Sequence, residues 1–473
     1  MQFAAAENGR PVWTPDAIPS DHPLYLSIAD SLERDVRRGA LAPGDRLPTL
    51  RAMARELGVN VMTVSRGYAE AARRGLVQGE VGRGTFVLAH KEGWSSLATL
   101  AGGAAGRIDF AFNLPALDLA RLRPRELLAE LAGRADELGW NAGYEPAGLA
   151  EHRRVAVSWL ARFGVAASAE RVLVTGGVQH GLAAALSAST SPGDTLAVEA
   201  LTYTGIRGLA GALHLRLAAV RCDEDGLDPD GFAALCRSRK VRVLYTMPTL
   251  HNPTGSVLPA ERRVALVELA RRHGVTLVED DCYGFLCSSA PPPLAALAPE
   301  RTYFLTGTSK SLAAGLRIGF MATPPSTEAH RRACERAAAF GWMASPLTAE
   351  MACCLIRSGR ADELVAERRR ECSERRALFD ARAPHGSAAA HPSSPHLLWP
   401  LPAEWAATDF EARALARGVA VTPAEVFAVE PAAAPRAVRL CLGTPPTREQ
   451  VMRGLEVLGE LVRGVPRAAA AVL

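Results

Sequence analysis

The stretch that decides the fold and chemistry of this chain is Gly307-Thr308-Ser309-Lys310-Ser311-Leu312-Ala313-Ala314-Gly315-Leu316-Arg317-Ile318-Gly319-Phe320. Lys310 is one of only three lysines, although lysines and arginines together number 54. A guanidinium replaces an ammonium on a solvated surface, but it cannot form an imine with a carbonyl compound. Arg317 follows in the same stretch and can return to hold a phosphate. Taken alone, a lysine among small residues is more often a surface residue, so a carbonyl-binding role for Lys310 depends on other segments.

Two groups of residues are candidates for the phosphate of such a compound. Residues 172–182 predict a strand, a glycine turn and a helix start, which together offer backbone N–H groups to an anion. Hydroxyls beside the lysine can add hydrogen bonds. The turn alone is a weak signal, because an ordinary strand-to-helix turn has the same pattern. The candidate residues are Gly177, Val178, Gln179, Thr308 and Ser309.

A carboxylate follows a predicted buried strand at residues 275–283. Open α/β sheets place ligands at the carboxyl ends of their strands. A carboxylate there can hold a pyridine nitrogen protonated, which keeps the ring an electron sink. We choose Asp280 for this role, with Asp281 second, and Tyr283 can donate to a ring hydroxyl. The alternative is an acidic helix cap after the strand.

Two more residues follow predicted strands and face the same edge of the sheet. Asn252 lies in a Pro-rich turn and can hydrogen-bond a hydroxyl on such a pyridine ring. Tyr203 can stack on a pyridine face. The alternatives are a plain turn for Asn252 and a core aromatic for Tyr203.

The chain is too long, at 473 residues, for one ordinary domain. From Ile108 onward, apolar runs alternate with helical stretches, which predicts a parallel sheet with helices on both faces. Helices dominate beyond about residue 325 and indicate a smaller C-terminal subdomain. We therefore predict a multidomain protein with a head over 22–88, a Gly-rich linker over 89–107 and an α/β body over 108–465.

The head has the pattern of a winged helix-turn-helix. Apolar residues spaced four apart mark a first helix over residues 24–38. Two shorter helices, over residues 50–57 and from residue 60 or 61 to residue 74, are separated by a tight turn. Residues 76–88 then predict a hairpin with Arg83 at its tip. This arrangement would place the second of the two short helices in the major groove of DNA.

DNA-contacting residues follow from that geometry. We predict that the first group below approaches base edges and that the second group contacts phosphates or the minor groove. The alternatives are a small helical bundle with no DNA role and, for any single arginine, a solvated surface charge. The first group is Asn60, Thr63 and Arg66, and the second is Arg46, Arg51 and Arg83.

Composition narrows the location and the chemistry. The formal net charge is +4, so any DNA-binding surface must be a local patch. No apolar run reaches the roughly 20 residues of a membrane span, and the N-terminus lacks the pattern of a secretory signal. The nine cysteines show no CxxC or zinc-type spacing. We expect reduced thiols in a cytoplasmic protein, without a metal site.

The head resembles the GntR-type winged helix. The resemblance lies in Pro43-Gly44-Asp45-Arg46-Leu47-Pro48-Thr49, Leu57-Gly58-Val59, Thr63-Val64 and Gly82-Arg83-Gly84-Thr85-Phe86-Val87. It covers nearly all of residues 22–88 and implies binding to double-stranded DNA.

The body resembles fold-type I aminotransferases, through Asn252-Pro253-Thr254-Gly255 and Ser309-Lys310. The resemblance covers about residues 108–460 and implies pyridoxal phosphate on Lys310 and a homodimer with sites at the subunit interface. It also implies that Arg439 binds a substrate carboxylate and that Tyr144 reaches the phosphate of the partner subunit. Gly307 departs from the family, because many relatives place a hydroxyl there, and Thr308 can supply that contact.

Together the halves resemble the MocR-type regulators. That family implies a DNA-binding transcription regulator whose body senses the cofactor or an amino-acid-like effector. The alternative is an active aminotransferase with an autoregulatory DNA-binding head, because the residues for half-transamination are present. A further alternative is a head that binds DNA around a cofactor-free body used only for dimerisation.

Overall fold

The computed structural model describes residues 13–14, 23–37, 41, 45–73, 76–80, 84–87, 107–114, 119–138, 140, 143–382 and 389–464. The proposed wing-tip residue Arg83 and all but the last residue of the proposed linker 89–107 lie outside these described residues. The chain divides into two compact units, Met1–Ser95 and Ser96–Leu473, which are considered separately below.

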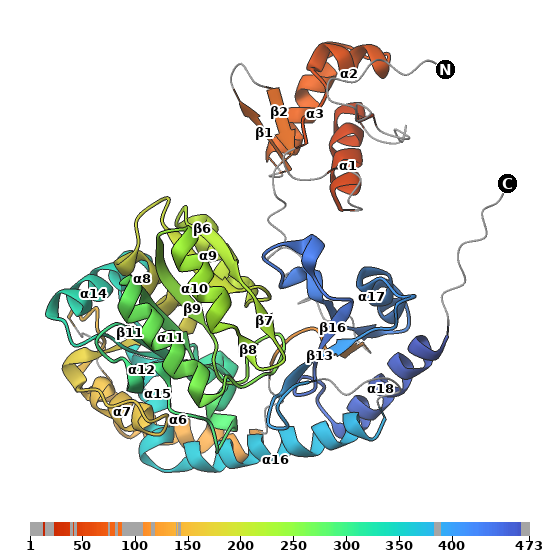
Figure 1. Ribbon diagram of the computed structural model, residues 1–473. Coiled ribbons are helices and arrows are strands. Elements are labelled where there is room, and N and C mark those ends of the chain that lie inside the picture. Colours follow the sequence, from red (N-terminus) through yellow and green to blue (C-terminus); the bar gives the residue numbers. More distant parts are fainter. Residues whose placement is uncertain are drawn as a thin grey trace. The chain divides into compact units, whose positions relative to one another are not determined.

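The first unit is a winged helix-turn-helix, as the sequence predicted (Figure 1). Its helices are α1 (Leu24–Arg37), α2 (Leu50–Glu56) and α3 (Val61–Arg73), and its antiparallel hairpin pairs β1 (Val77–Glu80) with β2 (Gly84–Val87). Ile28, Leu32 and Val64 are fully buried in its core. The hydroxyl of Tyr68 donates to the carbonyl of Pro48 at 3.0 Å, which ties α3 to the segment before α2.

The second unit is built on a seven-stranded sheet in the order β4-β12-β11-β10-β9-β5-β6. Successive residues of its strands belong to two different hydrophobic clusters. Leu196 and Val198 pack in one cluster, whereas Ala197 between them packs in the other. Since side chains alternate across a strand, both faces of the sheet are covered, as predicted. The strands are β4 (Val172–Thr175), β5 (Thr195–Glu199), β6 (Arg216–Val220), β9 (Val241–Thr246), β10 (Thr276–Asp280), β11 (Thr302–Gly307) and β12 (Gly319–Ala322).

One strand corrects the expectation of a parallel sheet. β12 runs antiparallel to both of its neighbours, β11 and β4, while the other neighbouring strands are parallel. Parallel neighbours need a crossover of a dozen or more residues, usually with a helix. Residues 308–318, which join β11 to β12, contain only the four-residue helix α13 (Thr308–Ser311) and the short turn η4 (Ala314–Leu316). This short connection, which carries Lys310, therefore reverses the chain direction.

Helices cover the sheet on its two sides (Figure 1). α8 packs across β10, β11 and β12 and is itself covered by α14, while α10 and α12 contact the sheet and pack against α11. The remaining elements of this part are short hairpin strands, turns and helices. The bounds are α5 (Leu119–Leu122), α6 (Pro124–Ala132), α7 (Ala150–Ala161), α8 (Val178–Ser189), α9 (Thr204–Ala212), β7 (Cys222–Asp223), β8 (Gly226–Leu227), α10 (Pro229–Ser238), α11 (Ala260–His273), α12 (Leu294–Leu297), α14 (Thr327–Gly341) and α15 (Pro346–Arg357).

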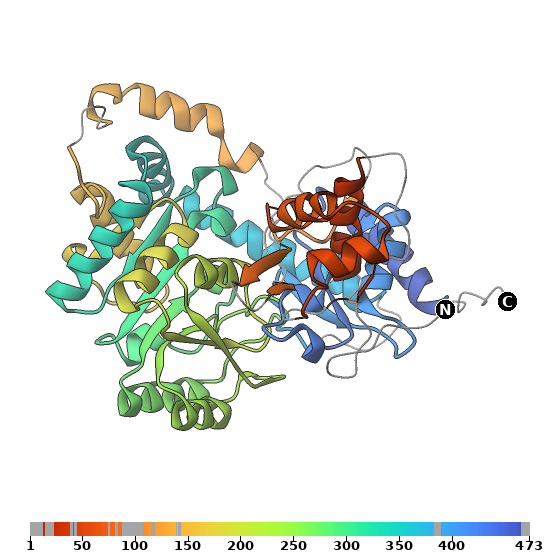
Figure 2. The same cartoon turned by 90° about the horizontal axis from the view of Figure 1, so that it is seen from above.

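A smaller C-terminal subdomain lies beside the large sheet, and its elements from β13 onward are drawn in blue in Figures 1 and 2. Its three-stranded sheet has the order β13-β16-β15, and β3, from the start of the body, pairs with β14 in this subdomain. Trp399, Phe410 and Leu440 lie in its separate core. Its elements are β3 (Ile108–Asp109), α16 (Arg360–Asp380), β13 (His396–Pro400), α17 (Ala407–Ala416), β14 (Val419–Ala420), β15 (Thr422–Pro423), η6 (Pro431–Ala433), β16 (Ala437–Cys441) and α18 (Arg448–Arg463). No helix in the described part of the chain has the length and apolar character that crossing a membrane requires.

Candidate functional site

Lys310 lies in α13, on the short connection between the central strands β11 and β12. The side chain is half-buried, and its Nζ donates a hydrogen bond to the backbone carbonyl of Asn113. Burial lowers the pKa of Lys310 below its ordinary value, because a low-dielectric surrounding disfavours the charged ammonium. The lower pKa increases the fraction of neutral amine, which is the form that attacks a carbonyl carbon.

Asp280 ends β10 and is almost completely buried. Its Oδ2 accepts a hydrogen bond from the Tyr245 hydroxyl at 3.0 Å, whereas its Oδ1 is buried without a hydrogen-bond partner among the described residues. Burial raises the pKa of this carboxyl group to about 6. An unpaired buried acceptor is costly. A protonated ring nitrogen that donated to Oδ1 would satisfy it.

Asp281, the second choice from the sequence, has a different environment. Its Oδ1 accepts a hydrogen bond from the backbone N–H of Gly284 at 2.6 Å. Burial and the neighbouring Glu279 raise the pKa of Asp281 to about 7. Because its carboxylate already fixes the following turn, the geometry favours Asp280 as the partner of a ring nitrogen.

A corner with the geometry to hold an anion lies where β4 meets α8. Gly177, at the start of α8, has a φ of 92°, which favours glycine. A Cβ on Gly177 would lie 3.4 Å from Nη2 of Arg317, so the guanidinium sits beside this turn. Arg317 is exposed and makes no hydrogen bond or ion pair with other described residues. Its charge and the N-terminus of α8, where Val178 and Gln179 lie, therefore both face a potential phosphate site.

The hydroxyl groups beside the lysine are used unequally. The fully buried Thr308 donates its hydroxyl to the carbonyl of Ile318 at 3.1 Å, so that proton is already committed. Ser309 makes no hydrogen bond with the described residues and keeps its hydroxyl free. A Cβ on Gly307 would approach Cγ2 of Val178 to 2.8 Å. The departure at Gly307 therefore has a steric reason, because the Val178 side chain takes the space that a larger residue would need.

The side chains of Gln179 and Tyr203 both contact Gly205. Nε2 of Gln179 donates to the carbonyl of Gly205 at 3.1 Å, and its Oε1 is buried without a partner among the described residues. A Cβ on Gly205 would lie 2.4 Å from the ring of Tyr203, so only glycine allows this ring position. The half-buried ring and the unpaired amide oxygen leave both residues able to contact a bound cofactor.

Arg439 lies in β16 of the smaller subdomain and is held from three directions. Nη1 donates to Oδ1 of Asn252 at 2.9 Å, and Nη2 donates to the carbonyl of Ala111. The guanidinium carbon lies 4.5 Å from the centre of the Phe427 ring. Arg439 is 4% exposed, and its Nε has no partner among the described residues. A buried, oriented guanidinium is suited to binding a carboxylate in two parallel hydrogen bonds.

A chain of hydrogen bonds that the sequence did not reveal joins Lys310 to this arginine. Nδ2 of Asn113 lies 2.8 Å from Nδ1 of His396, and Nε2 of His396 lies 2.9 Å from the carbonyl of His251, next to Asn252. Burial lowers the pKa of His396 to about 3, so the ring is neutral. The carbonyl requires an N–H at Nε2, which leaves Nδ1 to accept from the amide of Asn113. No motif marks Asn113 or His396, and only the fold brings them together.

The two other candidate tyrosines, Tyr283 and Tyr144, differ in position. Tyr283 is buried, and its ring packs edge-on against His396 with centroids 5.0 Å apart. Its hydroxyl makes no hydrogen bond with other described residues, so it can donate to a ligand. Tyr144 is 57% exposed and packs edge-on against Trp342, away from these contacts. A role for Tyr144 at a site within its own subunit therefore has no support here, while the expected role toward a partner subunit stays a prediction.

The head presents its candidate residues in several ways. Oδ1 of Asn60 accepts from the backbone N–H of Met62 at 2.9 Å, so Asn60 caps α3. Arg66 stacks on the Tyr25 ring at 4.4 Å. Arg46 packs against the wing, where a Cβ on Gly84 would lie 2.8 Å from its Nε. Arg51 is exposed and Thr63 half-buried, whereas Met62, which the sequence did not single out, is 67% exposed.

One cluster in the described residues brings three metal-type ligands together, His152, Glu350 and Cys353. Nε2 of His152 lies 3.0 Å from Oε2 of Glu350, while Arg134 and Arg357 both bind Oε1. These contacts lower the pKa of Glu350 to about 2. Because two guanidinium groups already neutralise the carboxylate, the cluster has the character of an ion-pair network.

Comparison with known proteins assigns both halves. The aminotransferase class I and II family matches residues 107–458, and the gntR family of bacterial regulatory proteins matches residues 24–87. The HTH-type transcriptional regulator YdeF of Bacillus subtilis is 29% identical over 98% of this chain and 99% of its own length. The HTH-type transcriptional regulator TauR of Rhodobacter capsulatus is 30% identical over 64% of this chain and 68% of its own length.

Solved structures resemble the body. A kynurenine aminotransferase of Pyrococcus horikoshii, solved in complex with PMP, has a TM-score of 0.70 and 25% identity and covers 79% of this chain and 94% of its own. LysN, an α-aminoadipate aminotransferase of Thermus thermophilus solved with N-(5′-phosphopyridoxyl)-L-leucine, has a TM-score of 0.68 and 26% identity. It covers 78% of this chain and 95% of its own.

The head and the Lys310 site together define a class of protein, a DNA-binding winged helix-turn-helix joined to an aminotransferase-type α/β body. The chain belongs to the aminotransferase class I and II family and carries a gntR-family head, which is the MocR-type arrangement. The cofactor of this body is pyridoxal phosphate. The unpaired Oδ1 of Asp280 and the exposed Arg317 beside Gly177 fit its ring nitrogen and its phosphate.

Proposed function

We propose that this protein is a transcription regulator whose body senses pyridoxal phosphate or an amino-acid-like effector. The observation that carries the proposal is the pairing of a DNA-binding head with two selective groups in the body. Lys310 is a half-buried amine with a lowered pKa, and Arg439 is a buried guanidinium held by Asn252. These groups select compounds with a primary amine and a carboxylate.

Each residue of the site has a role toward the bound cofactor. Pyridoxal phosphate supplies a carbonyl carbon and a conjugated ring that withdraws electrons. Lys310 would hold the carbonyl carbon covalently, and Asp280 would accept from the ring nitrogen through Oδ1. Arg317, the hydroxyl of Ser309 and the start of α8 at Gly177 would hold the phosphate. The ring hydroxyl would contact Tyr283 and Asn252, and Tyr203 would cover one face of the ring.

The link from effector to DNA requires two arrangements of a dimer. A ligand that binds one arrangement better shifts the population toward it, and the two heads then meet paired DNA half-sites with a changed affinity. Exposed aromatic residues support a subunit interface on the body, namely Trp140, Tyr144, Phe340 and Trp342. Since operator DNA is the partner, we place the working protein in the cytoplasm.

A second function is favoured by one specific observation. Lys310, Asp280 and Arg439 form a complete set for binding an amino acid and moving its protons, so the body has the groups of a working aminotransferase. Steady conversion of an amino acid with a 2-oxo acid would support this function. Absence of turnover, together with effector-dependent DNA binding, would contradict it.

The first experiment is an absorbance spectrum of the protein with added pyridoxal phosphate, for wild type and Lys310→Ala. We expect an imine band in wild type that the variant lacks and that an effective amino compound shifts. Operator binding would then be measured with and without that compound. A wild-type protein without the band would refute the sensor function and leave a DNA-binding protein whose body serves only for dimerisation.

A further inference from the structure

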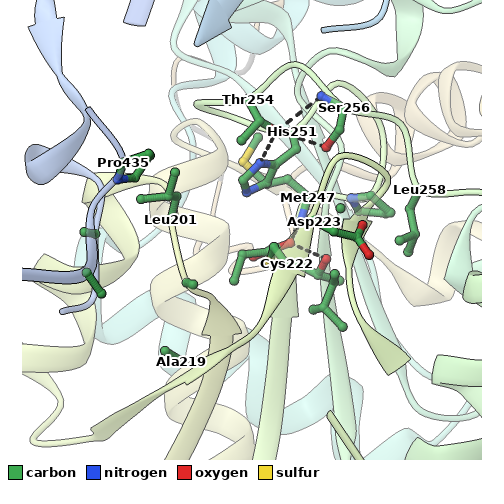
Figure 3. Close-up of a pocket in the computed structure, with 18 of the residues that line it drawn as sticks. Leu201, Ala219, Cys222, Asp223, Met247, His251, Thr254, Ser256, Leu258 and Pro435 are labelled. Atoms are coloured by element: carbon green, nitrogen blue, oxygen red, sulfur yellow. Dashed lines mark hydrogen bonds between the residues drawn. The ribbon is translucent and has the colours of Figure 1, made fainter. Parts of the chain in front are cut away.

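A cavity separate from the Lys310 site lies next to the His251–Asn252 segment. Its walls are formed by side chains that the Lys310 site does not use. Its volume is about 330 Å³, and its walls come from the ends of β5, β6 and β9, the β7–β8 hairpin and the segment around η6. Figure 3 shows Leu201 and Pro435 on one side of the cavity and His251 and Met247 facing them. A volume of this size suits a small ligand.

The cavity contains a buried carboxylate with one free oxygen. Glu199, at the end of β5, is 2% exposed. Its Oε1 accepts hydrogen bonds from the Thr246 hydroxyl and from the backbone N–H of Met247, whereas its Oε2 is buried without a partner among the described residues. The two donors fix the carboxylate in position. The unpaired Oε2 is therefore an acceptor that is costly to leave unmatched.

No positive charge in the cavity wall neutralises Glu199. The lining residues include three acids and neither lysine nor arginine. Asp223, another of the acids, is paired outside the cavity with Arg262 at 2.7 Å. His251 is 4% exposed, burial lowers its pKa so that the ring is neutral, and its Nε2 is buried without a partner among the described residues. The remaining wall is mostly apolar, through Leu201, Met247, Leu258 and Pro435.

We propose that this cavity binds a small organic cation, namely a protonated amine with an apolar body. Its N–H group would donate to Oε2 of Glu199, and its apolar part would pack against Leu201, Met247 and Pro435. Neither Lys310 nor the cofactor takes part, so the proposal does not depend on the sensor function assigned above.

An occupant of this cavity would touch the segment that positions Arg439. The carbonyl of His251 accepts from Nε2 of His396 at 2.9 Å, and the next residue, Asn252, accepts from Arg439 at 2.9 Å. A ligand that orders His251 therefore also orders the group that holds the guanidinium. Binding at the two sites would be coupled, and such coupling is reciprocal.

The test uses N,N-dimethylbutylamine as the probe, with full-length protein loaded with pyridoxal phosphate. This tertiary amine is protonated at neutral pH and cannot form an imine, so it does not report on Lys310. We expect calorimetry to show saturable binding of one probe per chain. The Lys310→Ala variant should bind the probe equally well, which separates this test from that of the sensor function.

Three variants locate the binding. Glu199→Gln keeps the acceptor Oε1 for Thr246 and Met247 and should weaken probe binding about tenfold or more. Asp223→Asn, the matched control, removes a charge already paired with Arg262 and should change affinity less than about twofold. Ala219→Leu reduces the cavity volume and keeps Glu199, so it should also weaken binding even if Glu199→Gln fails to fold.

Other outcomes would overturn the proposal. Equal binding of the probe to wild type and to a folded Glu199→Gln variant would remove the carboxylate as the anchor. Equal affinity for isoamyl alcohol, an uncharged molecule with a similar apolar body, would mean an apolar cavity without a preference for cations. No saturable binding of the amine would mean that the cavity holds only water.

Discussion

Asp280→Asn tests the reasoning about the ring-nitrogen site most directly. Burial raises the pKa of Asp280 from 3.8 to about 6, so the folded cofactor-free protein favours the protonated acid. The contribution of the protonated Asp280 to the free energy of unfolding is complete below the pKa of the unfolded chain, and it is lost as the pH rises through about 6. The difference between the folded and unfolded pKa values corresponds to about 3 kcal/mol of stability lost above that pH, at about 1.4 kcal/mol per pH unit.

The asparagine variant carries no such ionisation cost, so its stability relative to wild type should rise with pH. The variant should gain at most about 3 kcal/mol of stability over wild type at pH 8. The gain is smaller if the new amide N–H₂ lies at the Oδ1 position, where it has no partner. Urea unfolding of the cofactor-free proteins would be followed by tryptophan fluorescence at pH values of about 4 and about 8. The variant should also bind pyridoxal phosphate about tenfold or more weakly, since it loses a charge-assisted hydrogen bond. A stability difference that is the same at both pH values would refute the assignment.

Three further predictions concern other parts of the protein. Arg439→Lys should weaken binding of an effective amino acid about tenfold or more, because an ammonium cannot replace a two-pronged guanidinium, while a spectral titration should show its decarboxylated amine unaffected; equal losses for both would contradict the carboxylate role. His396→Leu leaves the Asn113 amide without its partner, while the His251 carbonyl keeps its bond from the backbone N–H of Gly255, so the substitution should cost about 1–3 kcal/mol in a denaturant titration; an unchanged midpoint would remove the hydrogen-bond chain as a structural element. Asn60→Ala should destabilise the head by about 1 kcal/mol through loss of its cap, whereas Asn60→Asp should keep the cap. If both variants lose operator affinity in gel-shift titrations, Asn60 contacts DNA directly, and if only the alanine variant does, Asn60 acts through α3.

Much of the candidate site could be predicted because its residues lie in short local patterns. A strand followed by a carboxylate indicated Asp280, and a strand followed by a glycine turn and a helix start indicated Gly177. Both patterns depend on only a few consecutive residues. The three lysines made Lys310 stand out by composition alone. The head could also be predicted from the sequence, because its helices and hairpin follow one another within residues 24–87 and form their own core.

Other features depended on residues far apart in the sequence. Asn113, His396 and His251 form one hydrogen-bond chain although they come from the start of the body, the smaller subdomain and the large sheet. Thr308 is an example at shorter range, because only the reversal of β12 brings the carbonyl of Ile318 to its hydroxyl.

The sequence by itself determined the order of elements, the two domain types and the residues with distinctive chemistry, because these reside in local patterns and in side-chain type. The tertiary structure decided the direction of β12 and the cavity around Glu199, and it favours Asp280 over Asp281 as the partner of a ring nitrogen. The physical reason is that hydrogen-bond partners and burial are properties of three-dimensional neighbours. A free carboxylate oxygen such as Oε2 of Glu199 therefore becomes visible only after the chain has folded.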